Sequence, residues 1–248
     1  MEINKKLIKT KNLGNIVIKR VSKQIAKELI IKNHYSHKWN DGGFGLYNFG
    51  IFQEGEEEEN QCIGVAVYGY MKNLKAKLFK HNNPQAWIIE LNRMWIDDCL
   101  GKNAESLLIA HSLQMLKKLD KNIVAVQSFA DGRLGCGTIY KASNFKYFGF
   151  HYTRFLKNKR TQEIIHDQNF TNTKQRSAYL RNNMAFLLGD FTVFKTKTYR
   201  YIYVFDKRTE LKFNEKQYPP YEKGIEEITL IRNKELIKQR LTNFINEL

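Results

Sequence analysis

A short stretch in the middle of the chain combines residue types suited to proton transfer. The sequence DGRLGCGTIYKASN runs from Asp131 to Asn144 and follows the apolar run IVAVQSFA. It places an acid and three glycines at the end of an expected strand, and a tyrosine in the first turns of the helix that follows. Glycine-rich loops at strand ends are common places for binding and catalysis in α/β folds.

An acyl-transfer reaction needs two proton-transfer groups. One takes a proton from the amine nucleophile, and the other protonates the leaving thiolate. Asp131, or a water that it holds, is a candidate for the first role, and Tyr140 is a candidate for the second. The same strand delivers Ser128 close by. Two structural alternatives are about equally plausible: a turn or cap role for Asp131, and a packing role for Tyr140.

A second candidate site is the start of the clearest helix, which we predict over 103–119. The preceding strand ends near Asp97, and the loop DCLGKN leads into the helix. A helix N-terminus offers unpaired N–H groups and the positive end of a dipole, which suit a phosphate. We expect Asn103 to be the N-cap and Lys102 and Ser106 to add contacts. GKNAES matches neither a Walker motif nor GxGxxG, so this feature alone favours an ordinary capped helix.

The segment NHYSHKW holds two histidines, His34 and His37, three residues apart. A metal pair is conceivable, but no carboxylate stands nearby at a diagnostic spacing, so a substrate-binding loop is the better interpretation and the metal is left open. Tyr35 and Trp39 are candidates for stacking on a base. Trp39 would equally serve to cover the core.

Glu90 and Arg93 interrupt the apolar run AWIIELNRMWI, which reads as a buried central strand. Alternation places Glu90 and Asn92 on one face of that strand, and Leu91 and Arg93 on the other. A charge inside such a strand must be paired or must face a cleft. An internal ion pair is the alternative to a functional role.

These groups are positioned by an alternation of strands and helices, which predicts a mixed α/β domain over residues 1–150. Ser22 is a possible N-cap for the first helix, and the acidic run EGEEEEN reads as a solvated hairpin tip. From 151 to 248 the chain becomes a basic extension, and we interpret the two parts as one continuous domain. The expected strands are 14–20, 45–52, 62–70, 86–96, 123–130 and 198–205, and the expected helices are 22–33, 103–119, one that begins at Thr138, and 234–248.

The charge balance indicates a polyanionic partner. The 248 residues include 41 Lys and Arg against 25 Asp and Glu, a formal charge of +16. Nucleic acid is the first candidate and anionic lipid the second, while a generally lysine-rich composition is the alternative. No run approaches the roughly 20 apolar residues of a membrane span. Residues 151–208 alone carry twelve basic and four acidic side chains, interleaved with aromatic ones.

Several of these motifs, in this order, resemble known proteins. IYKASNFKYFG resembles the Y-x-K-x-G-F-x-x-x-G stretch of the GNAT acyltransferase fold, with Ser143-Asn144 in place of the usual glycine. NHYSHKW, ELNRMWIDD, KNAESLLIAHSLQMLKK, QSFADGRLGCGTIYKASNF and YRYIYVF resemble the Mom family of phage DNA-modifying proteins over residues 15–205. Members of that family alter the exocyclic amine of adenine in DNA, which blocks restriction enzymes.

The resemblance implies an α/β fold with a GNAT-like mixed central sheet flanked by helices. It implies a transferase that adds an acyl or carbamoylmethyl-type group to adenine N6, with an acyl-CoA donor and double-stranded DNA as partner. The protein would act without a membrane in the cytoplasm of a bacterial host, encoded by a phage or prophage, and a homodimer is possible.

The resemblance also assigns roles to individual residues. The catalytic residues would be Asp131, Tyr140, Ser128, His34, Tyr35 and Arg93. The donor would be held by Gly101, Lys102, Asn103, Ala104, Ser106 and Asn144. DNA would be held by Trp39, Arg154, Lys157, Lys159, Arg160, Lys174 and Arg176.

Two other functions are compatible with these residues. One is a GNAT acyltransferase acting on a protein lysine, a polyamine or an RNA base. The other is a nucleic-acid-binding relative that has lost the chemistry, which would tolerate Tyr140→Phe and Asp131→Ala.

Overall fold

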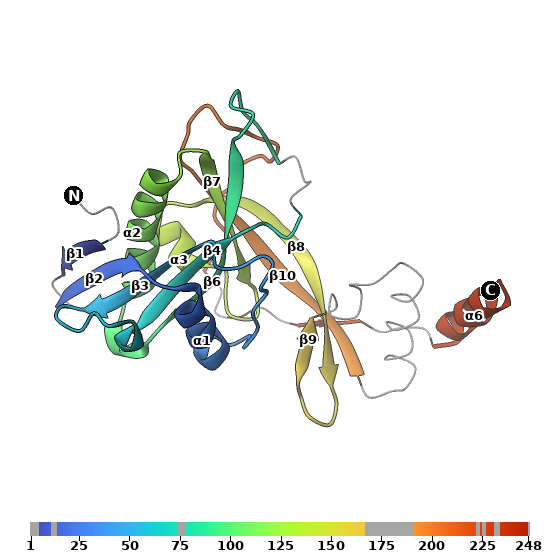
Figure 1. Ribbon diagram of the computed structural model, residues 1–248. Helices are drawn as coiled ribbons and strands as arrows, with labels where there is room; N and C mark the ends of the chain where they lie inside the picture. Colours follow the sequence, from blue (N-terminus) through green and yellow to red (C-terminus); the bar gives the residue numbers. More distant parts are fainter. Residues whose placement is uncertain are drawn as a thin grey trace. The chain divides into compact units, whose positions relative to one another are not determined.

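The computed structural model describes residues 5–10, 14–73, 78–166, 191–221, 224, 227–230 and 234–247, and in these it is a mixed α/β structure. The predicted class is therefore confirmed. Figure 1 shows the elements along the chain: β1 (Lys5–Lys9), β2 (Asn15–Arg20), α1 (Lys23–Asn33), β3 (Tyr47–Gln53), the 3-10 helix η1 (Glu59–Gln61), β4 (Gly64–Gly69), β5 (Phe79–Lys80), β6 (Trp87–Ile96), the 3-10 helix η2 (Asp98–Leu100), α2 (Ala104–Leu119), β7 (Ile123–Asp131), α3 (Thr138–Ala142), β8 (Lys146–Asn158), β9 (Ile164–His166), β10 (Phe191–Val204), β11 (Glu210–Leu211), β12 (Ile228–Thr229) and α6 (Lys234–Asn246). No helix in these described ranges is long and apolar enough to cross a membrane.

The chain divides into two compact units. Unit 1 comprises Met1–Phe129, Gly137–Gly149 and Arg200–Pro219; unit 2 comprises Ala130–Cys136, Phe150–Tyr199 and Pro220–Leu248. The long strands β7, β8 and β10 contribute residues to both units. The predicted boundary near residue 150 stays a prediction.

The main sheet has the strand order β1-β2-β3-β4-β6-β7-β10-β8-β9, with β12 paired to β10. Strands β1, β2, β3, β4 and β6 are antiparallel neighbours, whereas β6 and β7 run parallel and are connected through α2. The parallel pairing ends at Glu90 and Gln127, although both strands continue beyond that point. This pair of residues therefore marks the place where the two central strands stop sharing backbone hydrogen bonds.

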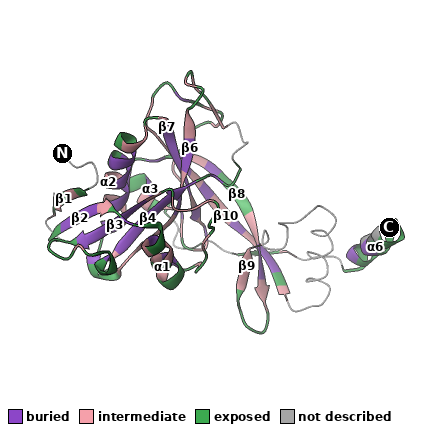
Figure 2. Ribbon diagram, viewed as in Figure 1, coloured by how far each residue is buried: buried purple, intermediate pink, exposed green. Residues whose placement is uncertain are grey.

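Helices cover both faces of the sheet in unit 1 (Figure 1). Val65 and Val67 of β4 belong to the core cluster that includes Ala26 and Ile30 of α1. Tyr68 points to the other face, where its hydroxyl lies 2.6 Å from that of Ser112 on α2. This two-sided cover follows from the alternation of side chains along a strand. It leaves the central strands buried, as Figure 2 shows.

The acidic run after β3 is more than a solvated tip. Both the backbone N–H and the hydroxyl of Ser22 donate to the Glu59 carboxylate, at 2.9 and 2.8 Å. Glu57 forms an ion pair with Lys5 at 2.6 Å. Ser22 is the N-cap of α1, as predicted, and its side chain accepts from the Ile25 N–H. The run thus attaches the β3–β4 connection to β1 and to the start of α1.

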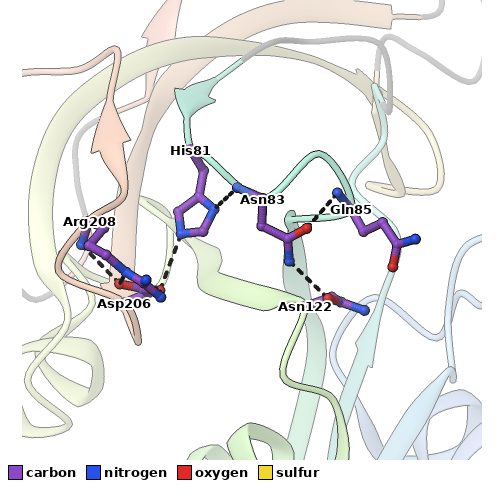
Figure 3. Close-up of polar contacts among 6 residues, drawn as sticks. All are labelled: His81, Asn83, Gln85, Asn122, Asp206 and Arg208. Carbon is purple, nitrogen blue, oxygen red and sulfur yellow. Dashed lines mark hydrogen bonds and ion pairs between the residues drawn. The ribbon is translucent and has the colours of Figure 1, made fainter.

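A polar network in unit 1 holds the loop that precedes β6 (Figure 3). His81 Nε2 lies 3.2 Å from the Asp206 carboxylate, which also accepts from the guanidinium of Arg208. The Asn83 amide donates to Asn122 Oδ1 at 3.0 Å. Because Asn122 immediately precedes β7, the network fixes the entry of both parallel strands, β6 and β7.

Candidate active site

Tyr140 is buried in unit 1 and is positioned by the short helix α3. Its hydroxyl lies 2.9 Å from Ser128 Oγ, which also lies 2.9 Å from the carbonyl oxygen of Leu91. A hydroxyl has one proton, so Ser128 Oγ donates either to the Leu91 carbonyl or to the Tyr140 hydroxyl. The Tyr140 ring stacks on Tyr201 with centroids 5.0 Å apart. Burial raises the pKa of Tyr140 to about 12, so the side chain is a fixed, protonated phenol at neutral pH.

The predicted acceptor-side residues lie close to one another in unit 1. The Arg93 guanidinium donates to the Asn92 carbonyl at 2.6 Å and lies 4.8 Å from the Phe44 ring centroid. Burial lowers the pKa of Arg93, while electrostatic attraction from Tyr35, Glu90 and Tyr140 raises it. The structure therefore brings Arg93 within electrostatic reach of Tyr35 and Tyr140.

His34 is a buried, neutral histidine at the end of α1. Its Nδ1 accepts from the Ser36 N–H at 3.1 Å, and its ring contacts that of Tyr35 at 4.3 Å between centroids. Burial lowers the pKa of His34 to about 4, and the positive charges of Arg93 and His37 act in the same direction. Among the described residues, no three His, Cys, Asp or Glu side chains converge so as to hold a metal ion.

Glu90 is a further functional candidate, to which the motifs assigned no specific role. Its Oε1 accepts from the Asn92 amide at 3.2 Å, and its Oε2 accepts from the Gln127 amide at 2.9 Å. Burial raises the pKa of Glu90, although these two hydrogen bonds and the charges of Arg93 and Arg200 oppose that shift. The carboxylate is therefore held by two neutral amides rather than by the close ion pair expected as the structural alternative.

A β-bulge explains how these side chains gather. Val67 of β4 pairs with Arg93, but Tyr68 pairs with Leu91, so Asn92 is an extra residue in β6. A bulge twists the strand and redirects its side chains, so the strict alternation assumed from the sequence does not hold here. The sequence did signal Glu90, as a charge in an apolar strand. It gave no signal for Gln127 or Arg200, which are distant along the chain.

Several polar atoms around Glu90 are buried without a hydrogen-bond partner among the described residues. They are Asn92 Oδ1, Gln127 Oε1, Arg93 Nε and Arg200 Nε. Leaving such groups unsatisfied costs roughly 1 to 3 kcal/mol each, so a native protein rarely collects them without a reason. Two acceptors and two donors near one carboxylate are the groups that a polar substrate would satisfy.

The predicted donor-binding loop lies before α2. Asn103 occupies the N-cap position but has a left-handed backbone (φ 71°) and makes no side-chain capping bond, so the expected cap is absent. Ser106 Oγ turns back to donate to the Asn103 carbonyl at 3.0 Å. Ser143 Oγ lies 3.4 Å from the Ser106 carbonyl, which places neighbouring Asn144 beside the same loop. The first N–H groups of α2 are thus left without a capping side chain, which suits an anion.

Asp131 lies in unit 2, whereas Tyr140 lies in unit 1, and their shared role stays a prediction. The Asp131 carboxylate accepts from the backbone N–H of Arg133 at 3.0 Å and is paired with its guanidinium. The same guanidinium lies 4.2 Å from the Phe155 ring centroid.

The predicted DNA contacts are divided among the two units and the rest of the chain. Arg154 and Lys157 are on β8, and Lys159 and Arg160 are exposed in the turn that follows. Lys174 and Arg176 lie outside the described residues. Trp39, in unit 1, packs edge-on against Phe44, beside the cluster that α1 covers, as expected of a residue that covers the core. Its contact with DNA stays a prediction.

The strand order, the α2 crossover between parallel strands and the separation of those strands after Glu90 form the mixed sheet flanked by helices that the GNAT resemblance predicted. Similar solved structures include ribosomal-protein-S5-alanine acetyltransferase from Vibrio fischeri, with a TM-score of 0.43 and 9% identity over 82% of this chain and 98% of that one. Another is Arabidopsis thaliana NAA60 in complex with a bisubstrate analogue, with a TM-score of 0.44 and 8% identity over 76% and 97% of the two chains.

The family is established by sequence. The Mom protein family matches residues 15–220, and the chain belongs to that family. The chain is 30% identical over 214 residues to the methylcarbamoylase Mom of Escherichia phage Mu, which covers 83% of each protein.

Proposed function

We propose that this protein is a DNA modification enzyme that transfers an acyl or carbamoylmethyl-type group to the N6 amine of adenine. In a bacterial host, the modified base would protect phage DNA from restriction. Membership of the Mom family and the printed activity of the phage Mu relative, methylcarbamoylase, support a group transfer of this kind. The observation that carries the proposal is the cluster of half-buried Glu90 and Arg93 with buried Asn92 and Gln127, at the place where β6 and β7 cease to pair.

The chemistry of adenine explains why such a cluster is needed. The N6 lone pair is delocalised into the ring, so the amine is a poor nucleophile, and in a duplex it is also hidden. The base must leave the stack, at a cost of about a few kcal/mol, before it reaches a buried group. An extruded adenine offers N–H groups and ring nitrogens. These match the unused acceptors Asn92 Oδ1 and Gln127 Oε1 and the unused donors Arg93 Nε and Arg200 Nε.

Glu90 is suited to receive the N6 proton. Each of its oxygens accepts one amide hydrogen bond, and an ionised carboxylate oxygen has a second lone pair to offer. The raised pKa of Glu90 makes it a stronger base than a solvated glutamate. As the N6–carbon bond forms and the bond to the leaving group breaks, Glu90 would gain one proton. Tyr140, protonated at neutral pH, would supply one to the leaving group.

Asp131 is the second candidate for the base, as the sequence suggested. Both of its oxygens are already engaged by Arg133, whereas Glu90 is bound only by neutral amides. We therefore propose that Glu90 accepts the N6 proton and that Asp131 organises the loop through Arg133. Asp131→Asn would then retain more activity than Glu90→Gln.

The donor proposed here is an acyl-CoA. The uncapped first turn of α2, with Gly101, Lys102 and Ser106, offers backbone N–H groups and one cation to a pyrophosphate. When bound, such a donor would supply the activated carbonyl for the acyl form of this transfer. A backbone N–H in the unpaired part of β6 or β7 could stabilise the oxyanion.

Nucleoside mass spectrometry tests the proposed function. DNA is digested from cells that express the chain, or its Tyr140→Phe or Glu90→Gln variant. Lys207→Gln, an exposed change in unit 1, is the control. A heavier deoxyadenosine that depends on Tyr140 and Glu90 supports the proposal, and its mass identifies the group. Unmodified deoxynucleosides, with expression verified, would instead favour a protein or RNA acceptor.

A further inference from the structure

Unit 2 carries an open strip of aromatic and lysine side chains on β8 and β10. Phe150 and Tyr152 of β8 are 47% and 46% exposed. Their rings meet edge to face, with centroids 5.5 Å apart. Lys195 Nζ lies 4.4 Å from the Tyr152 centroid, and Lys197 Nζ lies 5.2 Å from that of Phe150. We call these four residues the aromatic–lysine strip. Alternate residues of a strand share a face, so all four project to the same side of two neighbouring strands.

Part of the other face of the same two strands is packed. Phe155 and Phe194 stack there at 5.5 Å, and the hydroxyls of Thr153 and Thr198 lie 2.6 Å apart. Thr196 is fully buried on that side. The packed face accounts for the folding of this part of unit 2, so the exposed rings are not needed to complete its core. Adjacent large rings left half exposed mark a surface that meets a partner.

The charge of the strip indicates what that partner is. Residues 150–158 and 191–199 contain no Asp or Glu. The strip therefore presents cations and aromatic faces without a nearby acid on its own strands. Stacking platforms combined with positive side chains are the means by which proteins hold unpaired nucleotides. A duplex offers phosphates but hides the faces of its bases, so it would use the lysines and leave the rings unused.

We propose that the aromatic–lysine strip binds single-stranded DNA, with bases stacked on Phe150 and Tyr152 and phosphates paired with Lys195 and Lys197. This proposal rests on the proposed function, because modification of adenine N6 requires the base to leave the duplex. The strip would hold the opened strand. Alternate residues on a strand are about 6.8 Å apart, so the two ammonium groups form a row that an extended sugar–phosphate backbone can follow.

Fluorescence anisotropy with the full chain tests the proposal. The probes are a short labelled deoxyoligonucleotide, its duplex, and a ribo-oligonucleotide of the same sequence, each over a range of salt concentrations. One variant combines Phe150→Leu with Tyr152→Leu, and another combines Lys195→Gln with Lys197→Gln. The matched controls are Tyr221→Leu, a 73% exposed tyrosine of unit 2 outside the strip, and the pair Lys207→Gln and Lys212→Gln. Circular dichroism and thermal melting verify that each variant folds.

The two variants should fail in different ways. Loss of the rings should weaken binding of the single strand by about tenfold or more with little change in salt dependence. Loss of the two lysines should reduce the salt slope by about 1.4, since each phosphate contact on a single strand contributes about 0.7. The control variants should bind as the unaltered chain does.

Three results would overturn the proposal. The first is a folded ring variant that binds the single strand normally, and the second is a duplex bound as tightly as the single strand with no dependence on the rings. The third is RNA bound at least about tenfold more tightly than DNA. The same variants are analysed by nucleoside mass spectrometry. Modified DNA with ring-independent binding refutes the strip and leaves the proposed function standing. Ring-dependent binding without any modified base supports the strip and refutes the proposed function.

Discussion

Replacement of Glu90 by glutamine separates a catalytic carboxylate from a structural one. The glutamine keeps the shape of the side chain and removes its charge. One hydrogen bond would be lost if the side-chain nitrogen of the new glutamine faced the Gln127 Nε2 donor. The Gln127 amide has an unpaired Oε1, however, so a flip of that amide restores the contact. The local geometry therefore tolerates the change.

The expected effects on activity and stability are opposite. Loss of a positioned general base slows a reaction by about 100- to 10,000-fold, or roughly 3 to 5 kcal/mol in the barrier. Stability should be unchanged or higher at neutral pH. Because burial raises the pKa of Glu90, the folded state holds its proton more tightly than the unfolded state does. Stability is thus lost as pH rises through the raised pKa, and glutamine removes that loss. Over the same range the activity of the unaltered chain should rise, since the base must be ionised.

Two measurements on purified protein distinguish a catalytic from a structural role for Glu90. The rate of appearance of modified deoxyadenosine is followed as a function of pH, and the free energy of unfolding is taken from urea denaturation. Glu56→Gln, on the exposed acidic run, is the control. A Glu90→Gln variant with full activity would refute the base assignment. A variant that loses more than about 1 kcal/mol of stability along with its activity would show that Glu90 is structural.

Three further changes test neighbouring parts of the argument. Tyr140→Phe should abolish modification and cost about 1 kcal/mol of stability in thermal melts, because one buried hydrogen bond is lost; unaltered modification would exclude the phenol as the acid. Replacement of Lys157, Lys159 and Arg160 by alanine should flatten the salt dependence of DNA binding, and an unchanged slope would place the DNA site elsewhere. The pKa of His34 is lowered from 6.5 to about 4, so between these pH values only the unfolded state takes the proton. The free energy of unfolding should therefore fall by up to about 3 kcal/mol as pH falls from 6.5 to 4. Urea denaturation at pH 7 and pH 4 should show this loss in the unaltered chain and not in His34→Gln, and equal losses in both would remove His34 as its source.

The local pattern of the chain was sufficient to predict most elements of unit 1. Apolar runs predicted β2, β6 and β7, and helical spacing together with Ser22 predicted α1. These are local signals, because a strand or a capped helix depends on residues close together in the sequence. The order of the motifs was also sufficient to indicate the Mom family, which the comparison established.

Only the tertiary structure decided what surrounds each charged residue. The sequence showed that Glu90 needs a partner or a cleft, but Gln127 lies 37 residues away and reaches it only because β6 and β7 are parallel neighbours. The bulge at Asn92 depends on the register with β4. Likewise, the sequence alone assigned the N-cap of α2 to Asn103, whose backbone in the fold adopts a left-handed conformation that makes no cap. Apolar periodicity determined the elements and the order of the motifs indicated the family, whereas pairing between distant strands determined which polar atoms of the described residues lie buried without a partner.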